Sequence, residues 1–298
     1  MTSPTGSSFK SGMVAIVGPP NVGKSTLLNR FLGEKFSIVT PKPQTTRNQI
    51  RGIVNGKGYQ IVMLDTPGLH NARSPLNREM VKLALATLKE VDVILFLTDV
   101  SMPRPKSDTA TYLQGIGRPV ILVVNKIDLL PKKELLPLLQ AYEKVFPFKS
   151  IIPVSALLAD GIDRIIDELL QYIPEGPALY PLDMPVDATE RFIVSEMIRE
   201  KIFLYTGQEI PYSTAVLVES FKEDEETGMV FIHATVYVEK PSQKGILIGK
   251  NGAQLKKIGQ SARKDIEELL GQKVFLKLWL KVRKNWTKDP QFLRELGF

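Results

Sequence analysis

A single motif near the amino terminus constrains the fold of this chain more than any other feature of its sequence. The octapeptide G-P-P-N-V-G-K-S, residues 18–25, follows the apolar run 13–17 and opens a helical pattern. Glycines in such a strand–loop–helix unit allow backbone N–H groups to surround phosphate oxygens, and the helix dipole adds positive potential. We expect Lys24 to contact the β- and γ-phosphates of a nucleotide and the Ser25 hydroxyl to hold Mg²⁺.

A mostly parallel sheet is predicted for residues 13–173, where short apolar runs alternate with longer amphipathic ones. Runs 50–55 and 59–65 are joined by G-K-G, which indicates a hairpin and one antiparallel edge strand. We therefore expect an α/β domain at residues 13–175, after a flexible tail at 1–12. The other expected strands are 13–18, 91–99, 119–125 and 150–155, and the expected helices are 24–32, 77–89, 133–145 and 161–172.

Two later segments carry groups that suit a metal ion and a terminal phosphate. The tetrapeptide D-T-P-G, residues 65–68, closes a predicted strand, so the Asp65 carboxylate is placed to contact Mg²⁺ and the Gly68 N–H to contact the γ-phosphate. The polar loop 34–49 contains two adjacent threonines, one of which should reach the metal when the γ-phosphate orders the loop. We favour Thr46, with Thr45 as the alternative.

A base pocket is predicted at N-K-I-D, residues 125–128, which ends an apolar run. The Asp128 carboxylate can accept hydrogen bonds from N1–H and N2–H₂ of guanine. Adenine would leave it unpaired, which discriminates by roughly 10⁴-fold or more. The order of the three motifs therefore predicts a guanine nucleotide. The other expected contacts are Asn125, which braces the loop, the Lys126 stem over the purine face, and a backbone N–H of Ser155-Ala156 toward guanine O6.

The second half of the chain has a different composition. Four prolines between residues 174 and 185 rule out a continuous helix and predict a linker at 176–188. The helix and strand patterns that follow predict a small α+β unit at 189–298. Residues 240–298 hold 14 Lys and Arg against 5 Asp and Glu, which predicts a polyanionic partner, nucleic acid or anionic lipid, with plain solubility as the alternative.

Composition excludes several classes of chemistry. The chain has no cysteine, so disulfides and thiolate sites are ruled out, and two histidines, His70 and His233, are too few for a structural zinc site. No apolar run approaches the ~18 residues that a membrane span needs, and the first residues lack the pattern of a secretory signal. We therefore expect a cytoplasmic protein with two domains.

The motifs resemble those of the Era GTPases over about residues 10–286. The matching segments are residues 18–25, Q-T-T-R at 44–47, D-T-P-G-L-H at 65–70, N-K-I-D at 125–128 and I-G-K-N-G at 248–252. The resemblance implies a P-loop GTPase domain with a mostly parallel sheet, followed by an α+β KH (type II) domain. It also implies GTP hydrolysis with GTP/GDP and Mg²⁺ bound, and maturation of the small ribosomal subunit with the 3′ end of 16S rRNA as partner.

The nucleotide-site residues follow from the motifs and the resemblance. Leu69 occupies the position where many GTPases carry a glutamine that orients water, which predicts slow intrinsic turnover. Asn21 is placed either to help hold K⁺, as in related GTPases, or to stabilise the loop. The expected metal ligands are Ser25, Thr46 and Asp65, and the catalytic groups are Lys24, Thr46 and Gly68. The GTP-binding set is Gly18, Asn21, Val22, Gly23, Lys24, Ser25, Thr26, Asp65, Gly68, Asn125, Lys126, Asp128, Ser155 and Ala156.

RNA contacts are expected at G-K-N-G, residues 249–252, which the resemblance identifies as the KH clamp for about four nucleotides of single-stranded RNA. A plain helix–helix turn is the alternative. In the last predicted strand, 273–283, the even positions from 276 are apolar and should face the core, while the odd positions from 277 place one aromatic ring among cations on the other face. The RNA-binding set is Gly249, Lys250, Asn251, Gly252, Lys256, Lys257, Lys277, Trp279, Lys281 and Arg283.

Three functions compete for the whole chain. The leading hypothesis is a monomeric, GTP-hydrolysing RNA-binding switch, in which the γ-phosphate orders loops that bias the KH unit. The second is an RNA-binding assembly scaffold with GTP as a structural ligand and negligible turnover. The third is a membrane-surface GTPase whose basic end binds anionic lipid, and peripheral contact with the inner face of the cell membrane is also compatible with the first.

Overall fold

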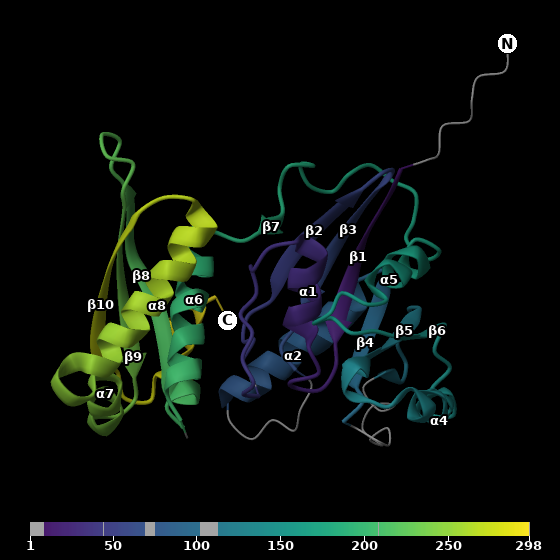
Figure 1. The fold of residues 1–298 in the computed structure, drawn as a ribbon, viewed down its shortest axis with the longest axis horizontal. Helices are drawn as coiled ribbons and strands as arrows, with labels where there is room; N and C mark the ends of the chain where they lie inside the picture. Colours follow the sequence, from purple (N-terminus) through teal and green to yellow (C-terminus); the bar gives the residue numbers. More distant parts are fainter. Residues whose placement is uncertain (1–8, 44, 69–74, 102–112, 208, 298) are drawn as a thin grey trace, which may run out of the picture. The chain divides into compact units, whose positions relative to one another are not determined.

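The structure is a computed structural model that describes residues 9–43, 45–68, 75–101, 113–207 and 209–297. The chain divides into two units, each of which is described by itself below (Figure 1). The first unit comprises Met1–Ser37, Thr46–Ala72 and Met80–Asp187. The second unit comprises Ile38–Thr45, Arg73–Glu79 and Ala188–Phe298.

The first unit is built on a seven-stranded sheet in the order β6-β5-β4-β1-β3-β2-β7. β1 pairs in parallel with β3 and β4, the pairs β4–β5 and β5–β6 are also parallel, and β2 is antiparallel to β3 and β7. The mostly parallel sheet is therefore confirmed. Its strands are β1 (Lys10–Val17), β2 (Ile50–Gly56), β3 (Tyr59–Asp65), β4 (Val93–Asp99), β5 (Val120–Asn125), β6 (Ser150–Pro153) and β7 (Val186–Asp187).

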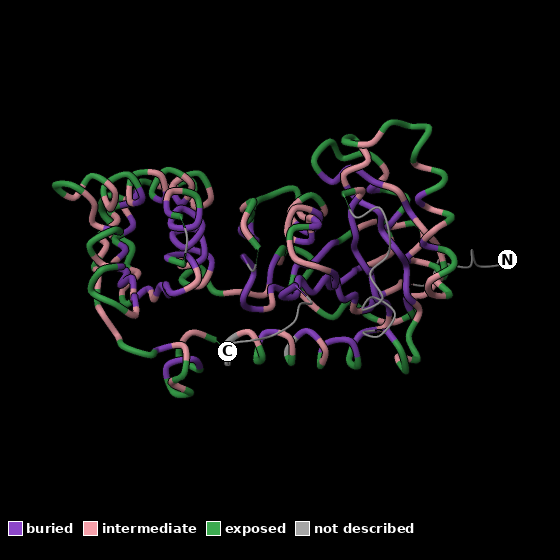
Figure 2. The backbone as a smooth tube through the Cα atoms, turned by 90° about the horizontal axis from the view of Figure 1, so that it is seen from below, coloured by how far each residue is buried: buried purple, intermediate pink, exposed green. Residues whose placement is uncertain are grey.

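The central strands are buried along most of their length because helices cover the sheet (Figure 2). Every residue of β4 and β5 is buried, as expected for near-continuous apolar runs in a parallel sheet. The same arrangement places the carboxyl ends of β1, β3, β4 and β5 at one edge of the sheet, where the sequence motifs lie. The helices are α1 (Lys24–Leu32), α2 (Pro75–Glu90), α4 (Lys132–Glu143) and α5 (Ile162–Leu169), with a 3₁₀ turn η1 (Ile127–Leu129).

The hairpin of β2 and β3 is confirmed, and one edge strand is antiparallel to its neighbour as expected, but that strand does not belong to the hairpin. The short strand β7 pairs with β2 at Gly52 and forms the edge instead. The proline-rich segment is held against the sheet, because the Gln60 side chain accepts hydrogen bonds from Leu179 N (2.7 Å) and Tyr180 N (2.9 Å). Residues 176–188, where a linker is expected, include β7, the last strand of the first unit.

The second unit has a three-stranded sheet in the order β10-β9-β8, with β8 antiparallel and β10 parallel to β9. Helices α6, α7 and α8 contact this sheet, and a Cβ added at Gly259 of α8 would lie 3.5 Å from Leu278 of β10. The α+β unit is confirmed. Its elements are α6 (Glu190–Tyr205), η2 (Pro211–Ser213), β8 (Thr214–Glu223), β9 (Val230–Val238), α7 (Pro241–Ile248), η3 (Lys250–Gly252), α8 (Ala253–Leu270), β10 (Val274–Val282), η4 (Trp286–Lys288) and α9 (Pro290–Glu295).

The residues after β10 form two short helical elements, η4 and α9. Trp286 and Phe292 are fully buried, their rings lie edge to face, and the Trp286 indole N–H donates to the Ser213 carbonyl (3.0 Å). Two aromatic side chains thereby fix the last turns onto the unit. Among the helices of the described residues, none combines the length and apolarity that crossing a membrane requires.

Candidate functional site

The loop between β1 and α1 has the shape that the glycine positions predict. Gly18 has φ 151°, and a Cβ there would lie 2.1 Å from the Leu97 carbonyl oxygen. Gly23 has φ 99°, and its Cβ would lie 2.3 Å from Nδ2 of Asn125. Both positions therefore require glycine. The loop turns directly into the first helical residue, Lys24, so that the N-terminus of α1 points into the loop.

Lys24 is buried in this loop. Its Nζ donates hydrogen bonds to the carbonyl oxygens of Gly18 (3.2 Å) and Pro19 (2.8 Å). Burial lowers the pKa of Lys24 to about 8, and the nearby charge of Asp65 opposes that shift. A buried ammonium group that is hydrogen-bonded to neutral carbonyl oxygens gains from a further anionic partner, so the site favours phosphate.

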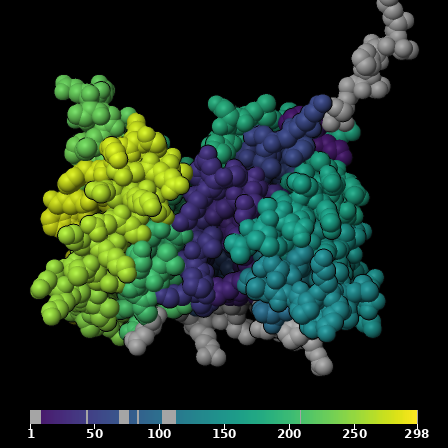
Figure 3. All heavy atoms as spheres, in the orientation of Figure 1, coloured from purple at the N-terminus to yellow at the C-terminus, as the bar shows by residue number. Residues whose placement is uncertain are grey.

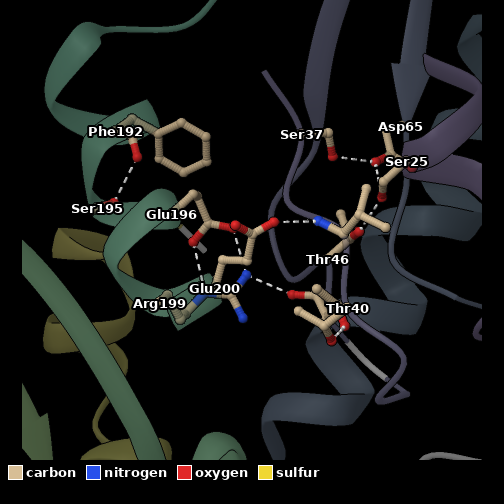
Figure 4. A network of polar contacts seen from close by, with 12 residues as sticks. Ser25, Ser37, Thr40, Thr46, Asp65, Phe192, Ser195, Glu196, Arg199 and Glu200 are labelled. Atoms are coloured by element: carbon tan, nitrogen blue, oxygen red, sulfur yellow. Dashed lines mark hydrogen bonds and ion pairs between the residues drawn. The ribbon is translucent and has the colours of Figure 1, made fainter. Parts of the chain in front are cut away.

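The metal-site residues converge on Asp65 at the end of β3. Its Oδ2 accepts hydrogen bonds from Ser25 Oγ (2.6 Å) and Ser37 Oγ (2.8 Å), and Thr46 Oγ1 lies 2.8 Å from Ser25 Oγ (Figure 4). Asp65 is fully buried, its Oδ1 has no hydrogen-bond partner, and burial raises its pKa against the lowering effect of Ser25 and Lys24. An unpaired buried carboxylate oxygen beside two hydroxyls fits a hard cation such as Mg²⁺.

The structure separates the two adjacent threonines. Thr46 belongs to the first unit and reaches Ser25, whereas the Thr45 hydroxyl bonds with Thr40 Oγ1 (2.6 Å) and the Lys42 carbonyl (2.7 Å). Of the two alternatives left open by the sequence, the geometry favours Thr46 as the metal ligand. The neighbouring Gly68 lies against the phosphate loop, since a Cβ there would be 3.0 Å from Pro20 N.

Segment 38–45, which the contacts assign to the second unit, is held by side chains of α6. Glu200 Oε1 accepts from Val39 N (3.0 Å), and Arg199 Nη2 donates to the Thr45 carbonyl (2.5 Å) (Figure 4). Arg199 is buried and forms an ion pair with Glu196 (2.5 Å). The polar side chains of α6 therefore fix the backbone of this segment at both of its ends.

The base pocket is braced mainly by Asn125. Its Nδ2 donates to the Val22 carbonyl (2.8 Å) and its Oδ1 accepts from Ala156 N (2.9 Å), so one side chain ties the phosphate loop to the loop after β6. Asp128 is exposed, and its Oδ1 accepts from Ser155 Oγ (2.6 Å). A backbone N–H of Ser155 or Ala156 was expected to face guanine O6. The Ala156 N–H donates to Asn125 and the Ser155 N–H to the Asp160 carbonyl (3.0 Å), so the O6 contact stays a prediction.

Three residues of the site were missed by sequence reasoning. Asp99, buried at the end of β4, accepts from Lys126 Nζ (2.6 Å), and Ser37 is the second donor to Asp65. Arg30 of α1 donates to the carbonyl oxygens of Ala156 (3.1 Å) and Leu157 (2.6 Å). Only Asp99 carried a signal, because it is a carboxylate at the carboxyl end of an apolar strand.

The turn between α7 and α8 has the geometry of a backbone clamp. Gly249 has φ 70° and Gly252 has φ 78°, a left-handed backbone that glycine favours, and Lys250 and Asn251 are exposed between them. Figure 3 shows α7 and α8 at the surface of this unit. On α8, the exposed Lys256 and Lys257 follow the turn directly.

The other predicted RNA contacts lie elsewhere on the unit. Strand residues alternate between the two faces of a sheet, and Leu278 faces α8, so Lys277, Trp279 and Lys281 point away from the helices. Arg283 is bonded to Asp289 (2.7 Å) and lies over the Phe292 ring. The structure thus brings Lys256 and Lys257 to the clamp but not the residues of β10. Leu69 and His70 lie outside the described residues.

A sheet with these motif loops, joined to such an α+β unit, defines a P-loop GTPase that carries a KH domain. Family models agree with both assignments. Residues 13–126 match the model described as a 50S ribosome-binding GTPase, and residues 209–287 match the KH domain model.

Known proteins of this class match over nearly the full chain. The chain is 52% identical over 292 residues to the GTPase Era of Geobacter metallireducens, and the match covers 97% of this chain and 98% of that protein. It is 53% identical over 293 residues to the GTPase Era of Geotalea uraniireducens, with the same coverage. A solved single-residue variant of Aquifex aeolicus Era bound to GDP·AlF₄⁻ matches with a TM-score of 0.93 at 41% identity, covering 97% of this chain and 99% of that one. The chain belongs to the Era family of GTPases, and the assignment favours hydrolysis over the scaffold with negligible turnover.

Proposed function

We propose that this GTPase acts in the maturation of the small ribosomal subunit by binding the 3′ end of 16S rRNA through its KH unit. The observation that carries the proposal is the clamp at residues 249–252, with exposed cations on the helix that follows it. A solved Era with a TM-score of 0.93 to this chain, at 41% identity and with 97% and 99% of the two chains covered, is in complex with MgGDPNP and nucleotides 1506–1542 of 16S rRNA. Backbone approach at the glycines and phosphate attraction by Lys256 and Lys257 are the recognition chemistry.

Hydrolysis follows from the groups around Asp65. Lys24 would contact the β- and γ-phosphates, and Ser25, Thr46 and Asp65 would hold Mg²⁺. When bound, Mg²⁺ neutralises charge on the phosphate oxygens. Water attacks the γ-phosphorus while the bond from phosphorus to the β–γ bridging oxygen breaks, so that GDP leaves with the electron pair and inorganic phosphate is released. Lys24 and backbone N–H groups of the loop and of Gly68 would stabilise the negative charge on the phosphate oxygens.

The link between nucleotide and RNA is proposed to run through two consecutive residues. Arg199 holds the Thr45 carbonyl, and the next residue, Thr46, reaches the metal site. A γ-phosphate that fixes the position of Thr46 therefore also shifts the conformational equilibrium of the adjoining segment 38–45, which α6 holds. A population shift of this kind needs a difference in binding free energy of only a few kcal/mol between the two states.

Exchange of Thr46 for Ala is expected to lower the Mg²⁺-dependent rate of GTP hydrolysis by at least about tenfold, because a metal ligand is lost. Thr45→Ala is the matched control, since its hydroxyl bonds only within segment 38–45, and its rate should stay within about threefold of wild type. Multiple-turnover phosphate release over a range of Mg²⁺ concentrations measures both variants. Equal rates for the two would remove Thr46 from the metal site.

The RNA target is tested by crosslinking in cells followed by sequencing of the bound RNA. Reads are expected to concentrate at the 3′ end of 16S rRNA, and a Gly252→Asp chain expressed at the same level should lose them. Reads spread evenly over unrelated transcripts would refute the ribosomal target.

We also propose that the protein works as a monomer in the cytoplasm. Two further expectations are that Asn21 lies beside a K⁺ ion and that the protein makes peripheral contact with the inner face of the cell membrane.

A further inference from the structure

Helices α6, α7 and α8 contact the sheet of the second unit and pack on one of its two faces. On β9 the residues Ile232, Ala234, Val236 and Val238 are at most 1% exposed and face the helices. The alternate residues of β9 and β10 lie on the opposite face. We call this surface the outer face and define it by Phe231, His233, Phe275, Lys277, Trp279 and Lys281.

Aromatic side chains are unusually exposed on the outer face. Trp279 is 50% exposed, Phe275 48% and Phe231 37%, and the rings of Phe231 and Phe275 lie 5.7 Å apart. Among the described residues, the Phe292 ring of α9 contacts the Tyr237 ring at one end of this face. Large rings gathered on an otherwise polar surface indicate a binding site rather than a core.

Cations are interleaved with these rings. Lys277 lies between Phe275 and Trp279 along β10, and its Nζ is 4.6 Å from the Trp279 ring centre. Lys281 follows and is 3.3 Å from Glu219, the acidic side chain to which it is paired on this face. Flat rings that alternate with exposed ammonium groups combine base stacking with phosphate attraction, the pattern of surfaces that bind single-stranded nucleic acid.

We propose that the outer face stacks bases of a single-stranded RNA segment that continues from the segment held by the clamp. The proposal rests on the RNA-binding function proposed above and extends it to a second surface. The clamp holds about four nucleotides, so a longer RNA must leave it. β10 is an edge strand that contacts α7 and α8. RNA that leaves the clamp therefore reaches Phe275 and Trp279 by passing around the edge of β10.

The two tryptophans of the chain make the outer face directly observable. Trp279 is half exposed whereas Trp286 is fully buried, so stacking of a base on Trp279 should quench part of the emission and leave the contribution of Trp286. In the experiment, the full chain is first loaded with a GTP analogue and Mg²⁺. RNA of the 16S sequence 1506–1542 is then added in steps, and both tryptophan emission and RNA binding are recorded. Trp279→Phe is expected to abolish the quenching and keep the affinity within about threefold.

Removal of the ring supplies the energetic test. Trp279→Ala is expected to weaken binding of this RNA by about tenfold, in the range of one lost base–aromatic stack. The matched control is Leu204→Ala, an exposed apolar side chain on α6 of the same unit, which should bind and be quenched as wild type is. Unchanged emission in the wild type together with unchanged affinity of Trp279→Ala would overturn the proposal.

Other outcomes distinguish this proposal from the RNA-binding function on which it rests. If the wild-type chain binds no RNA, the proposed function itself fails. If RNA binding survives Trp279→Ala while concentration-dependent self-association is lost, the outer face is a protein interface and the proposal is wrong. If Trp279→Ala and Gly252→Asp each weaken binding, and Gly252→Asp also removes the quenching of Trp279, the two surfaces act in one RNA path as proposed.

Discussion

Replacement of Asp128 by Asn is expected to move the nucleotide preference from guanosine to xanthosine triphosphate. The exposed carboxylate is placed to accept from N1–H and N2–H₂ of guanine, with Oδ1 oriented by Ser155. An amide at this position cannot accept both hydrogens, but its NH₂ can donate to the 2-carbonyl of xanthine. GTP affinity should fall roughly 10²- to 10⁴-fold, since both hydrogen bonds to the charged carboxylate are lost and each contributes about 1.5–3 kcal/mol.

Competition binding of labelled GTP and XTP to ligand-free protein measures this exchange. Asp163→Asn, an exposed carboxylate at the start of α5, is the matched control and should leave both affinities unchanged. Folding of Asp128→Asn is verified by its XTP binding. A variant that keeps the wild-type preference for GTP would contradict the base pocket assigned to residues 125–128.

Gly252→Asp is expected to abolish RNA binding and leave GTP affinity within about threefold. A Cβ at Gly252 meets nothing within 4 Å, and Asp tolerates the left-handed backbone there better than most residues, so the unit should still fold. The added carboxylate occupies the surface that the RNA backbone must approach, and it repels phosphate. Gly252→Asp should therefore lose more RNA affinity than the neutral variant Gly252→Asn.

The chain offers a close control for this variant. Gly271 ends the same helix, has φ 65° and also has open space around its Cβ position. It lies 18 helical residues from the clamp, which is ~27 Å along α8. Equilibrium RNA binding should be unaffected by Gly271→Asp. Equal losses for the two glycines would indicate general destabilisation, and retained binding by Gly252→Asp would place the clamp elsewhere.

The parts of the fold that sequence predicted best are those with strong local rules. The phosphate loop needs an apolar strand before it and a helix after it, and α1 begins and ends at the predicted residues, Lys24 and Leu32. Asn125 and Asp65 likewise end buried strands, so their place at the carboxyl edge of the sheet follows from the parallel pairing.

Features that depend on tertiary contacts could not be predicted. β7 has only two residues in a proline-rich segment, and its pairing with Arg51 and Gly52 of β2 is a tertiary contact that no local pattern indicates. The choice between Thr45 and Thr46 lies in an irregular loop with no periodicity, so only the hydrogen bond to Ser25 separates them. By contrast, the alternation of β10 correctly predicted that its even positions, such as Leu278, lie on the face that α8 covers.

The central claim is that the third phosphate of the nucleotide changes how tightly the KH unit binds RNA. Its most direct test is the equilibrium affinity of ligand-free, full-length protein for the 16S 1506–1542 RNA with Mg²⁺ and either a non-hydrolysable GTP analogue or GDP. The account predicts at least about tenfold tighter binding with the analogue, a coupling free energy of ~1.4 kcal/mol. Equal RNA affinities with both nucleotides demonstrably bound would contradict it.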